Sequence, residues 1–243
     1  MNNFIKSTDT TSKVQYNIHD YDVPLTTVDI AIFAIIEHQL HVLMVERVDE
    51  PEVGYWALPG GFIDLSTDKN LEQTAHRKLK EKTGITSPYL EQVQSVGNDT
   101  RDPRGWSVTV LYFALVDFQQ TVLNDDATAE HTRWVNVNKL ASIRCAFDHQ
   151  DLIQIALERL RNKTRYTSLP ITLLPELFTL TELQRIFEIL LGRTIEAKSF
   201  RRRLLEAGTV QATEFEKRSG KRNAQLFRAS SISTSYEFSR AID

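Results

Sequence analysis

The hydrophobic positions in the N-terminal half of the chain predict a β-sheet. Residues 28–36 and 40–47 are apolar, β-branched runs separated by the polar residues 37–39, a pattern typical of a hairpin. Residues 107–116 are rich in strand-forming side chains, and residues 132–137 predict a further short strand.

Two helices accompany these strands. Residues 71–83 predict a helix that ends at Gly84, because glycine readily adopts the left-handed conformation that follows a helix. Residues 148–161 predict a second helix, with one apolar face formed by Leu152, Ile155, Ala156 and Leu160. This helix becomes polar at residues 161–165, where we place the end of the first domain. The pattern predicts an α/β fold, a mixed sheet with a helix packed on it.

The remainder of the chain predicts two more helices. Thr179 and Glu182 form a capping box that opens a helix through Leu191, and Gly192 closes it. After a short turn, residues 195–207 predict another helix. We expect its packing face and its basic face to lie on opposite sides, with Ala197, Phe200, Leu204 and Ala207 on the first and Lys198, Arg201, Arg202 and Leu205 on the second.

A hairpin with a basic tip follows these helices. Residues 209–215 and 225–229 predict its strands, and residues 216–223 its polar turn. Two helices, a short turn and a basic hairpin are typical of a winged helix-turn-helix. We therefore divide the chain into a flexible arm (1–21), a first domain (22–147), a connecting helix and linker (148–165) and a DNA-binding domain (166–243).

Composition and charge narrow the class of protein. The 243 residues are 41% hydrophobic and 25% charged, as in globular domains. The apolar run at residues 30–36 is much shorter than the ~18 residues of a membrane span, and the polar N-terminus lacks a secretory signal, so we expect a cytoplasmic location. The single cysteine, Cys145, allows no internal disulfide. Residues 196–222 hold eight basic and four acidic side chains, a concentration that attracts a phosphate backbone.

A glycine loop and the helix after it form a recognisable motif. The loop runs Ala-Leu-Pro-Gly-Gly-Phe at residues 57–62, and in the helix Arg77, Leu79, Glu81, Gly84 and Ile85 have the order of a Nudix box, the signature of diphosphate hydrolases. Lys78 and Lys82 stand where that signature has metal-binding glutamates. The loop is also two residues longer than in the signature, and Asp64, Asp68 and Glu72 are weak substitutes for its early glutamate.

The two lysines argue against the chemistry of the signature. A Mg²⁺ site needs hard anionic oxygens, and residues 78, 81 and 82 share one helix face. An ammonium can hold a diphosphate without activating water, so we expect nucleotide binding with hydrolysis absent or vestigial, and with no catalytic residue, metal or cofactor required. The alternative for Lys78 and Lys82 is an ordinary solvated helix face.

The whole chain resembles the Nudix-related transcriptional regulators of NAD metabolism, the NrtR family. Besides the box, the resemblance is carried by Glu46 and Arg47 with residues 55–62, by residues 101–106 and by residues 147–149. It implies a Nudix-like α/β/α sandwich that senses ADP-ribose or a related nucleotide. It also implies a winged helix-turn-helix that, as a homodimer on a palindromic double-stranded operator, represses genes of NAD synthesis or salvage. Release of the operator by the ligand is the family expectation.

Candidate ligand-binding residues follow from the motif and the resemblance. They are Arg47, Trp56, Gly60, Gly61, Phe62, Lys78, Lys82, Arg101, Asp102, Arg104, Phe147 and His149. Arginines around a glycine loop suit a bidentate grip on phosphate or ribose oxygens, although each could form an ordinary surface pair. Trp56 is a candidate for contact with an adenine face, yet Trp56 and Trp106 are more often core residues. His149 is most simply a helix-start histidine. If residues 147–149 line the pocket, ligand binding there would move the connecting helix.

Candidate DNA contacts lie on the second helix and the hairpin of the C-terminal domain. They are Lys198, Ser199, Arg201 and Arg202 on the helix and Lys217, Arg218, Lys221 and Arg222 on the wing. We expect Arg201 or Arg202 to read bases and the wing to add affinity and salt dependence; the alternative is a solvated face.

Three functional classes therefore compete. The favoured one is a ligand-sensing repressor without membrane association. The second is an active ADP-ribose or related Nudix hydrolase with an appended nucleic-acid module. In the third, the C-terminal domain only mediates protein contacts, which predicts no salt-dependent shift of promoter DNA.

Overall fold

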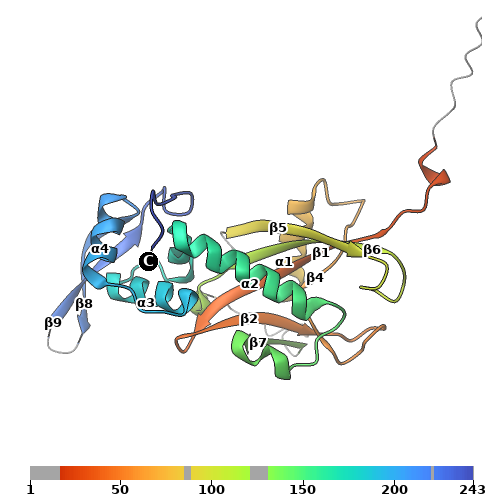
Figure 1. Ribbon diagram of the computed structural model, residues 1–243, viewed down its shortest axis with the longest axis horizontal. Coiled ribbons are helices and arrows are strands. Elements are labelled where there is room, and N and C mark those ends of the chain that lie inside the picture. Colours follow the sequence, from red (N-terminus) through yellow and green to blue (C-terminus); the bar gives the residue numbers. More distant parts are fainter. Residues whose placement is uncertain (1–16, 85–88, 121–130, 220–221, 243) are drawn as a thin grey trace, which may run out of the picture.

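The structure is a computed structural model that describes residues 17–84, 89–120, 131–219 and 222–242. The first half forms a layered α/β domain, and the C-terminal part forms a smaller domain at the other end of the molecule (Figure 1). Most of the predicted arm (1–16), Ile85 and Lys221 lie outside the described residues. The side chains of Lys82 and Arg222 also lie outside them.

A seven-stranded mixed sheet forms the centre of the first domain, within the described ranges. Its strands are β1 (Leu25–Ile36), β2 (Gln39–Glu46), β3 (Trp56–Ala57), β4 (Gly60–Phe62), β5 (Tyr89–Asn98), β6 (Ser107–Leu115) and β7 (Thr132–Asn136). The main order is β3-β2-β1-β6-β5, with β4 on β1 and β7 on β2; β1 and β6 run parallel. The mixed sheet and the β1–β2 hairpin confirm the sequence prediction. Glu37 and His38 both have positive φ in its tight turn, as the right-handed twist of a two-residue hairpin requires.

A helix covers each face of this sheet, which makes the predicted sandwich. Helix α1 (Leu71–Thr83) packs Ala75 and Leu79 on one face, and its ends match the prediction because the Asn70 side chain caps the start and Gly84 the end. Helix α2 (His149–Tyr166) packs Leu152 and Ala156 on the other. Short 3₁₀ turns lie before β1 (Ile18–Asp20), after β6 (Phe118–Gln120) and between β7 and α2 (Val137–Ser142).

Helix α2 is longer than the sequence pattern predicted. It continues to Tyr166, through the polar residues 161–165 that we took for the end of the domain. Lys163 within this stretch pairs with Glu91 of β5, and Thr164 is fully buried. The apolar core also continues past the helix to Leu173 and to Ile186 of the next domain. The polar run is therefore the last turn of a packed helix, because its side chains have partners that the local sequence does not reveal.

The C-terminal domain has the elements of a winged helix-turn-helix. They are a 3₁₀ turn (Leu169–Leu173), α3 (Leu180–Leu191), α4 (Ala197–Glu206) and the hairpin of β8 (Val210–Ser219) and β9 (Arg222–Ala229). The capping box of Thr179 and Glu182 is present, and Gly192 ends α3, as predicted.

Three details of this domain differ from the sequence prediction. Helix α4 begins two residues late, because the Glu196 carboxylate accepts hydrogen bonds from the backbone of Lys198 and Ser199 and so caps it. Ala197 is exposed, since it lies in the first turn beyond the core made by Phe200 and Leu204. Strand β8 runs into the predicted turn, because residues 216–219 pair with β9.

Candidate functional site

The glycine loop is held close to the central strand. Gly60 and Gly61 of β4 pair with Asp29 and Val28 of β1. A Cβ on Gly60 would lie 2.2 Å from Asp29 Oδ1 and 2.5 Å from the Val28 carbonyl oxygen, and Gly61 has φ +141°. Both positions therefore require glycine. The loop borders a cavity of about 410 Å³, whose lining includes Arg47, Gly60 and two residues that the sequence analysis did not select, Glu46 and His131.

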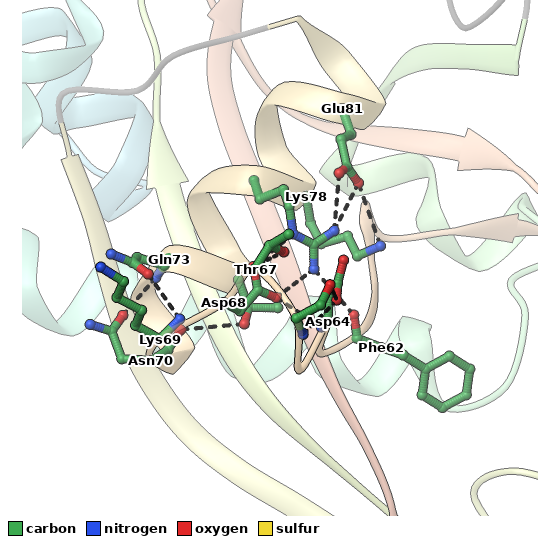
Figure 2. Close-up of polar contacts among 12 residues, drawn as sticks. Phe62, Asp64, Thr67, Asp68, Lys69, Asn70, Gln73, Lys78 and Glu81 are labelled. Atoms are coloured by element: carbon green, nitrogen blue, oxygen red, sulfur yellow. Dashed lines mark hydrogen bonds and ion pairs between the residues drawn. The ribbon is translucent and has the colours of Figure 1, made fainter.

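Lys78 reaches from α1 to this loop. Its side chain is 17% exposed, and its Nζ lies 3.5 Å from Glu81 Oε2 (Figure 2). A Cβ built on Gly61 would lie 3.3 Å from Lys78 Cε, so the lysine stem covers the glycine. The alternative of a solvated face is therefore wrong for Lys78, because close packing against the loop withdraws its side chain from solvent.

Arg77 binds the two carboxylates that remain near the box. Its Nε and Nη2 donate to Asp68 at 2.7 and 2.5 Å, and its Nη1 donates to both Glu81 oxygens at 3.0 and 3.1 Å. The hydrogen bond from Arg77 holds the pKa of Asp68 well below its ordinary value. For Glu81, partial burial opposes ionisation, but Arg77 and Lys78 outweigh it and lower the pKa. Both carboxylates are thus ionised and already paired with cations.

The other weak substitutes for the early glutamate lie elsewhere. Asp64 accepts hydrogen bonds from Ser66 in its own turn, and Glu72 is exposed, 4.0 Å from His76. Within the described ranges, no group of three or more His, Cys, Asp or Glu side chains has the arrangement of a metal site.

Arginines and aromatic rings gather beside the glycine loop. The guanidinium carbons of Arg47 and Arg104 lie 4.8 and 5.9 Å from the centre of the Phe147 ring, and Arg104 lies 5.2 Å from the Phe62 ring. Arg104 is held by two hydrogen bonds to Asp102, at 2.7 and 3.0 Å. The structure therefore brings together five of the predicted residues, which come from four separate places in the chain. We call Arg47, Phe62, Asp102, Arg104 and Phe147 the arginine–aromatic cluster.

Arg101 has a different environment from Arg104. Its side chain is 5% exposed, and it donates from Nε and Nη2 to the two Asp148 oxygens at 2.9 Å each. Asp29 lies 3.9 Å away. Arg101 thus joins the β5–β6 loop to the start of α2, and it is a buried pair instead of the surface pair that we weighed as its alternative. Arg101 and Asp148 are far apart in the sequence, so local sequence patterns cannot predict this ion pair.

Phe147 and His149 join the glycine loop to the start of α2. Phe147 has φ +51°, and its N–H donates to Glu52 Oε2 at 2.6 Å. The His149 Nδ1 accepts the N–H of Leu58 at 2.8 Å in a buried site. Glu52 and Leu58 are therefore hydrogen-bonded to the residues at the start of α2. Glu52 was not among the predicted site residues. The one local signal for a special role was its position beside Pro51, in a turn that contains a glycine.

His149 makes stability depend on pH. Burial lowers its pKa below the ordinary 6.5, so the folded protein keeps the ring neutral while the unfolded chain takes up a proton below that pH. The stabilisation is complete above pH 6.5 and is lost on acidification, by up to about 1.4 kcal/mol per pH unit. We expect urea unfolding between pH 7 and 5 to show this slope, with a smaller one for His149→Gln. Equal slopes in the two proteins would contradict the assignment.

The two tryptophans differ in their exposure to solvent. Trp56 is half-buried against the core, and the guanidinium carbon of Arg133 lies 4.0 Å from its ring centre. Arg133 thus lies over the ring that we considered for adenine, and the contact of Trp56 with adenine stays a prediction. Trp106 is 52% exposed and, with Arg104, borders a second cavity of about 630 Å³. Neither Arg133 nor this second cavity has a signal in the local sequence.

Helix α4 and the β8–β9 hairpin, which carry the predicted DNA contacts, lie at one end of the molecule (Figure 1). On α4, Lys198, Arg201 and Arg202 are exposed and Ser199 is half-buried. Arg201 Nη2 donates to Thr181 Oγ1 of α3 at 3.0 Å, while Arg202 lies 3.9 Å from Glu206.

Of the predicted wing contacts, Lys217 and Arg218 lie in strand β8, and Arg222 begins strand β9. The Lys217 ammonium donates to Glu182 at 2.7 Å, and Arg218 is an exposed residue opposite Asn223. This ion pair also lowers the pKa of Glu182, although partial burial opposes it.

Comparison with known proteins agrees with this architecture. Residues 25–154 match the model of the Nudix domain, and residues 170–229 match the model of the NrtR DNA-binding winged helix domain. Fold and sequence thus define a protein in which a Nudix domain is joined to a DNA-binding winged helix. The chain is 54% identical over 232 residues to the ADPR responsive transcriptional repressor NtrR of Acinetobacter baylyi, which covers 94% of this chain and 91% of that protein. The chain belongs to the NrtR family of Nudix-related regulators.

Solved structures from Shewanella oneidensis share this fold. NrtR complexed with a 27mer DNA has a TM-score of 0.85 and 43% identity, and the match covers 90% of this chain and 99% of that one. The Nudix domain of the same regulator complexed with ADP-ribose has a TM-score of 0.55 and 44% identity, and covers 60% of this chain and 94% of that one. In the described part of this chain, no helix is long and apolar enough to cross a membrane.

Proposed function

We propose that this protein is a transcriptional repressor of genes for NAD synthesis or salvage. In this proposal its Nudix domain binds ADP-ribose or a related nucleotide without hydrolysing it, and the bound ligand releases the operator. The names of the Acinetobacter and Shewanella regulators support the assignment of DNA and of this ligand class.

The observation that carries the proposal is the cation at position 78. A Nudix fold implies a divalent metal held by box carboxylates, but here the Lys78 ammonium lies against the glycine loop and Glu81 is paired with Arg77 and Lys78. These residues do not fit a metal cluster, because the Lys78 ammonium occupies the face of the box helix and pairs with Glu81. Loss of metal ligands costs several kcal/mol of transition-state stabilisation in phosphoryl chemistry, so binding survives where hydrolysis does not.

The surrounding residues suit a nucleotide diphosphate. Lys78, Arg47 and Arg104 supply positive charge near the glycine loop, and Phe62 and Phe147 supply ring faces. Asp102 orients Arg104, whereas Arg101 and His149 tie this region to α2. We assign Lys82 to the same anion-binding face from its position in the box.

The C-terminal domain supplies the DNA contacts in this proposal. The exposed cations of α4 suit the major groove, and Lys217 and Arg218 on β8, with Lys221 and Arg222, suit phosphate or the minor groove. A homodimer on a palindromic operator would present two such surfaces with matching symmetry.

A gel shift of the protein's own upstream DNA tests the proposal. ADP-ribose, NAD, nicotinamide mononucleotide and AMP are added in parallel at two salt concentrations. We expect a salt-dependent complex that ADP-ribose or one close relative dissociates, because phosphate contacts release counterions. Absence of any specific, salt-dependent complex would favour the reading in which this domain only contacts proteins.

An active Nudix hydrolase is the second candidate. The ionised carboxylates of Asp68 and Glu81 near the glycine loop are the observation in its favour. Incubation of ADP-ribose with the protein and Mg²⁺ or Mn²⁺, followed by chromatography, separates the candidates. The repressor is expected to return ADP-ribose unchanged, while the hydrolase would yield AMP and ribose phosphate at an enzyme-like rate.

A further inference from the structure

The C-terminal segment, residues 230–242, contacts both the end of α2 and helix α4. The sequence pattern predicted no helix or strand in this segment. In the structure it returns from the wing to the body of the domain. Its end lies beside the last turn of α2 in Figure 1. Phe238 and Ile242 are 7% and 2% exposed, and they belong to the same core as Phe200 and Leu204 of α4.

One side of this segment closes the end of α2. The last carbonyl groups of a helix have no partner inside the helix. Here the N–H of Phe238 donates to the Tyr166 carbonyl and the N–H of Ile242 to the Arg165 carbonyl, both at 2.6 Å. Ser168, just after the helix, donates from Oγ to the Ser233 carbonyl at 2.6 Å. The segment therefore follows α2 if that helix shifts.

The other side of the segment holds α4. The Arg203 guanidinium donates from Nη1 to the carbonyl oxygens of Arg240 and Ala241, at 3.2 and 2.5 Å. Arg193, in the turn before α4, donates to the Ile242 carbonyl at 2.8 Å. Bonds from a charged donor are stronger and more directional than apolar contacts. The Arg240 and Ala241 carbonyl groups thus restrict the rotation of α4 about its own axis, and the Ile242 carbonyl group holds the turn that precedes it.

Apolar packing alone would not fix that rotation. Helix α2 also contacts α3 through Ile186 and Leu190, and α3 contacts α4 through the Phe187 and Phe200 rings, 5.0 Å apart. Such contacts are non-directional, so they keep the helices together while allowing small rotations. Arg203 also differs from its neighbours, because Arg201 and Arg202 are exposed whereas Arg203 is half-buried against the segment.

We propose that Arg203 is a positioning residue for the DNA-binding helix, which it ties through the C-terminal segment to the end of α2. The inference rests on the proposed function, since the start of α2 adjoins the arginine–aromatic cluster through Phe147 and His149. Arg203 does not contact DNA. When the ligand changes the position of α2, Arg203 changes the orientation of the face of α4 that carries Arg201 and Arg202. Binding of ligand and binding of DNA are therefore coupled reciprocally.

The test measures operator affinity of the full chain by fluorescence anisotropy, at several salt concentrations, with and without saturating ADP-ribose. The variants are Arg203→Gln, Arg203→Lys and, as the matched DNA-contact control, Arg202→Gln. For Arg203→Gln we expect affinity to fall roughly three- to tenfold with an unchanged salt slope. The ratio of affinities without and with ADP-ribose should fall toward one. For Arg202→Gln the affinity for the operator should fall more than the affinity for scrambled DNA, as for a lost base contact, while the ratio stays at the parent's value.

Each outcome decides between the alternatives. Arg203→Lys should restore part of the ratio, because an ammonium can reach one of the two carbonyl groups; this variant carries the test if Arg203→Gln melts below the assay temperature. An unchanged ratio in Arg203→Gln would overturn the positioning role. So would a salt slope reduced by about 0.9, as for a lost phosphate contact, or a loss of specificity like that of Arg202→Gln. If ADP-ribose does not change the operator affinity of the parent protein, the proposed function itself is overturned. The measurement on the parent shows this before any variant is compared.

Discussion

Replacing Lys78 and Lys82 with glutamate is expected to weaken metal-free ADP-ribose binding by about 100-fold or more, because like charges across an interface cost several kcal/mol. Lys78 covers Gly61 and pairs with Glu81, so Lys78→Glu turns an attractive contact into carboxylate repulsion beside the glycine loop. The same double variant is expected to gain affinity for Mg²⁺, since carboxylates replace ammoniums at both box positions. Isothermal titration with ADP-ribose and then with Mg²⁺ measures both effects.

Lys80→Glu is the matched control for this charge reversal. Lys80 lies on the same helix but is exposed to solvent, so its variant changes the net charge by the same amount per site. It should bind ADP-ribose within about twofold of the parent, because exposed charges are screened. If the Lys78→Glu, Lys82→Glu protein binds ADP-ribose as well as the parent does, the idea that ammoniums stand in for the metal is wrong.

Replacing Arg201 and Arg202 with alanine is expected to abolish specific operator binding, with a loss of about 100-fold or more and no change in ADP-ribose affinity. Both side chains are exposed on α4, and each good base contact contributes about 1–3 kcal/mol of discrimination. Arg201 is also held by Thr181 of α3, which orients its guanidinium. Anisotropy with operator and scrambled DNA measures specificity, and calorimetry with ADP-ribose measures the first domain.

A second double variant separates contact from net charge. Lys139→Ala with Arg161→Ala removes two exposed cations from the first domain and its connecting helix. It should keep specific operator binding, because these residues lie outside the DNA-binding domain. An equal loss of operator and ADP-ribose binding in Arg201→Ala, Arg202→Ala would mean that the fold was damaged, and this would refute a role limited to DNA contact.

Local signals explain the parts of the fold that the sequence predicted well. A capping box needs only Thr179 and Glu182 at the right spacing, and both of its hydrogen bonds are present. The glycine ends of α1 and α3 follow from the preference of Gly84 and Gly192 for positive φ. The β1–β2 hairpin follows from two apolar runs around a short polar turn. Each of these signals acts within a few residues.

The errors arose where a partner is distant in the sequence. Residues 161–165 look like a linker because Lys163 finds Glu91 only after the sheet has formed. For Arg101 the sequence predicted ligand binding, with a surface ion pair as the alternative. Its buried ion pair with Asp148, at the start of α2, is visible only in the structure. Strand β8 extends past its expected end because its backbone pairs with β9 at residues 216–219. Polar side chains at these positions do not prevent that pairing.

The sequence by itself determined the four α-helices, the strands β1, β2, β6 and β7, the two-domain plan and the presence of lysines at positions 78 and 82 of the box, but not the strands β3, β4 and β5. Periodicity, capping and motif spacing are properties of neighbouring residues. Only the tertiary structure decided that Lys78 lies on the glycine loop, that Arg47, Arg104 and Phe147 meet, and that Arg203 holds the chain's own C-terminal segment. These contacts join segments separated by many residues, and they form only when the sheet, α2 and the winged helix pack into one continuous body.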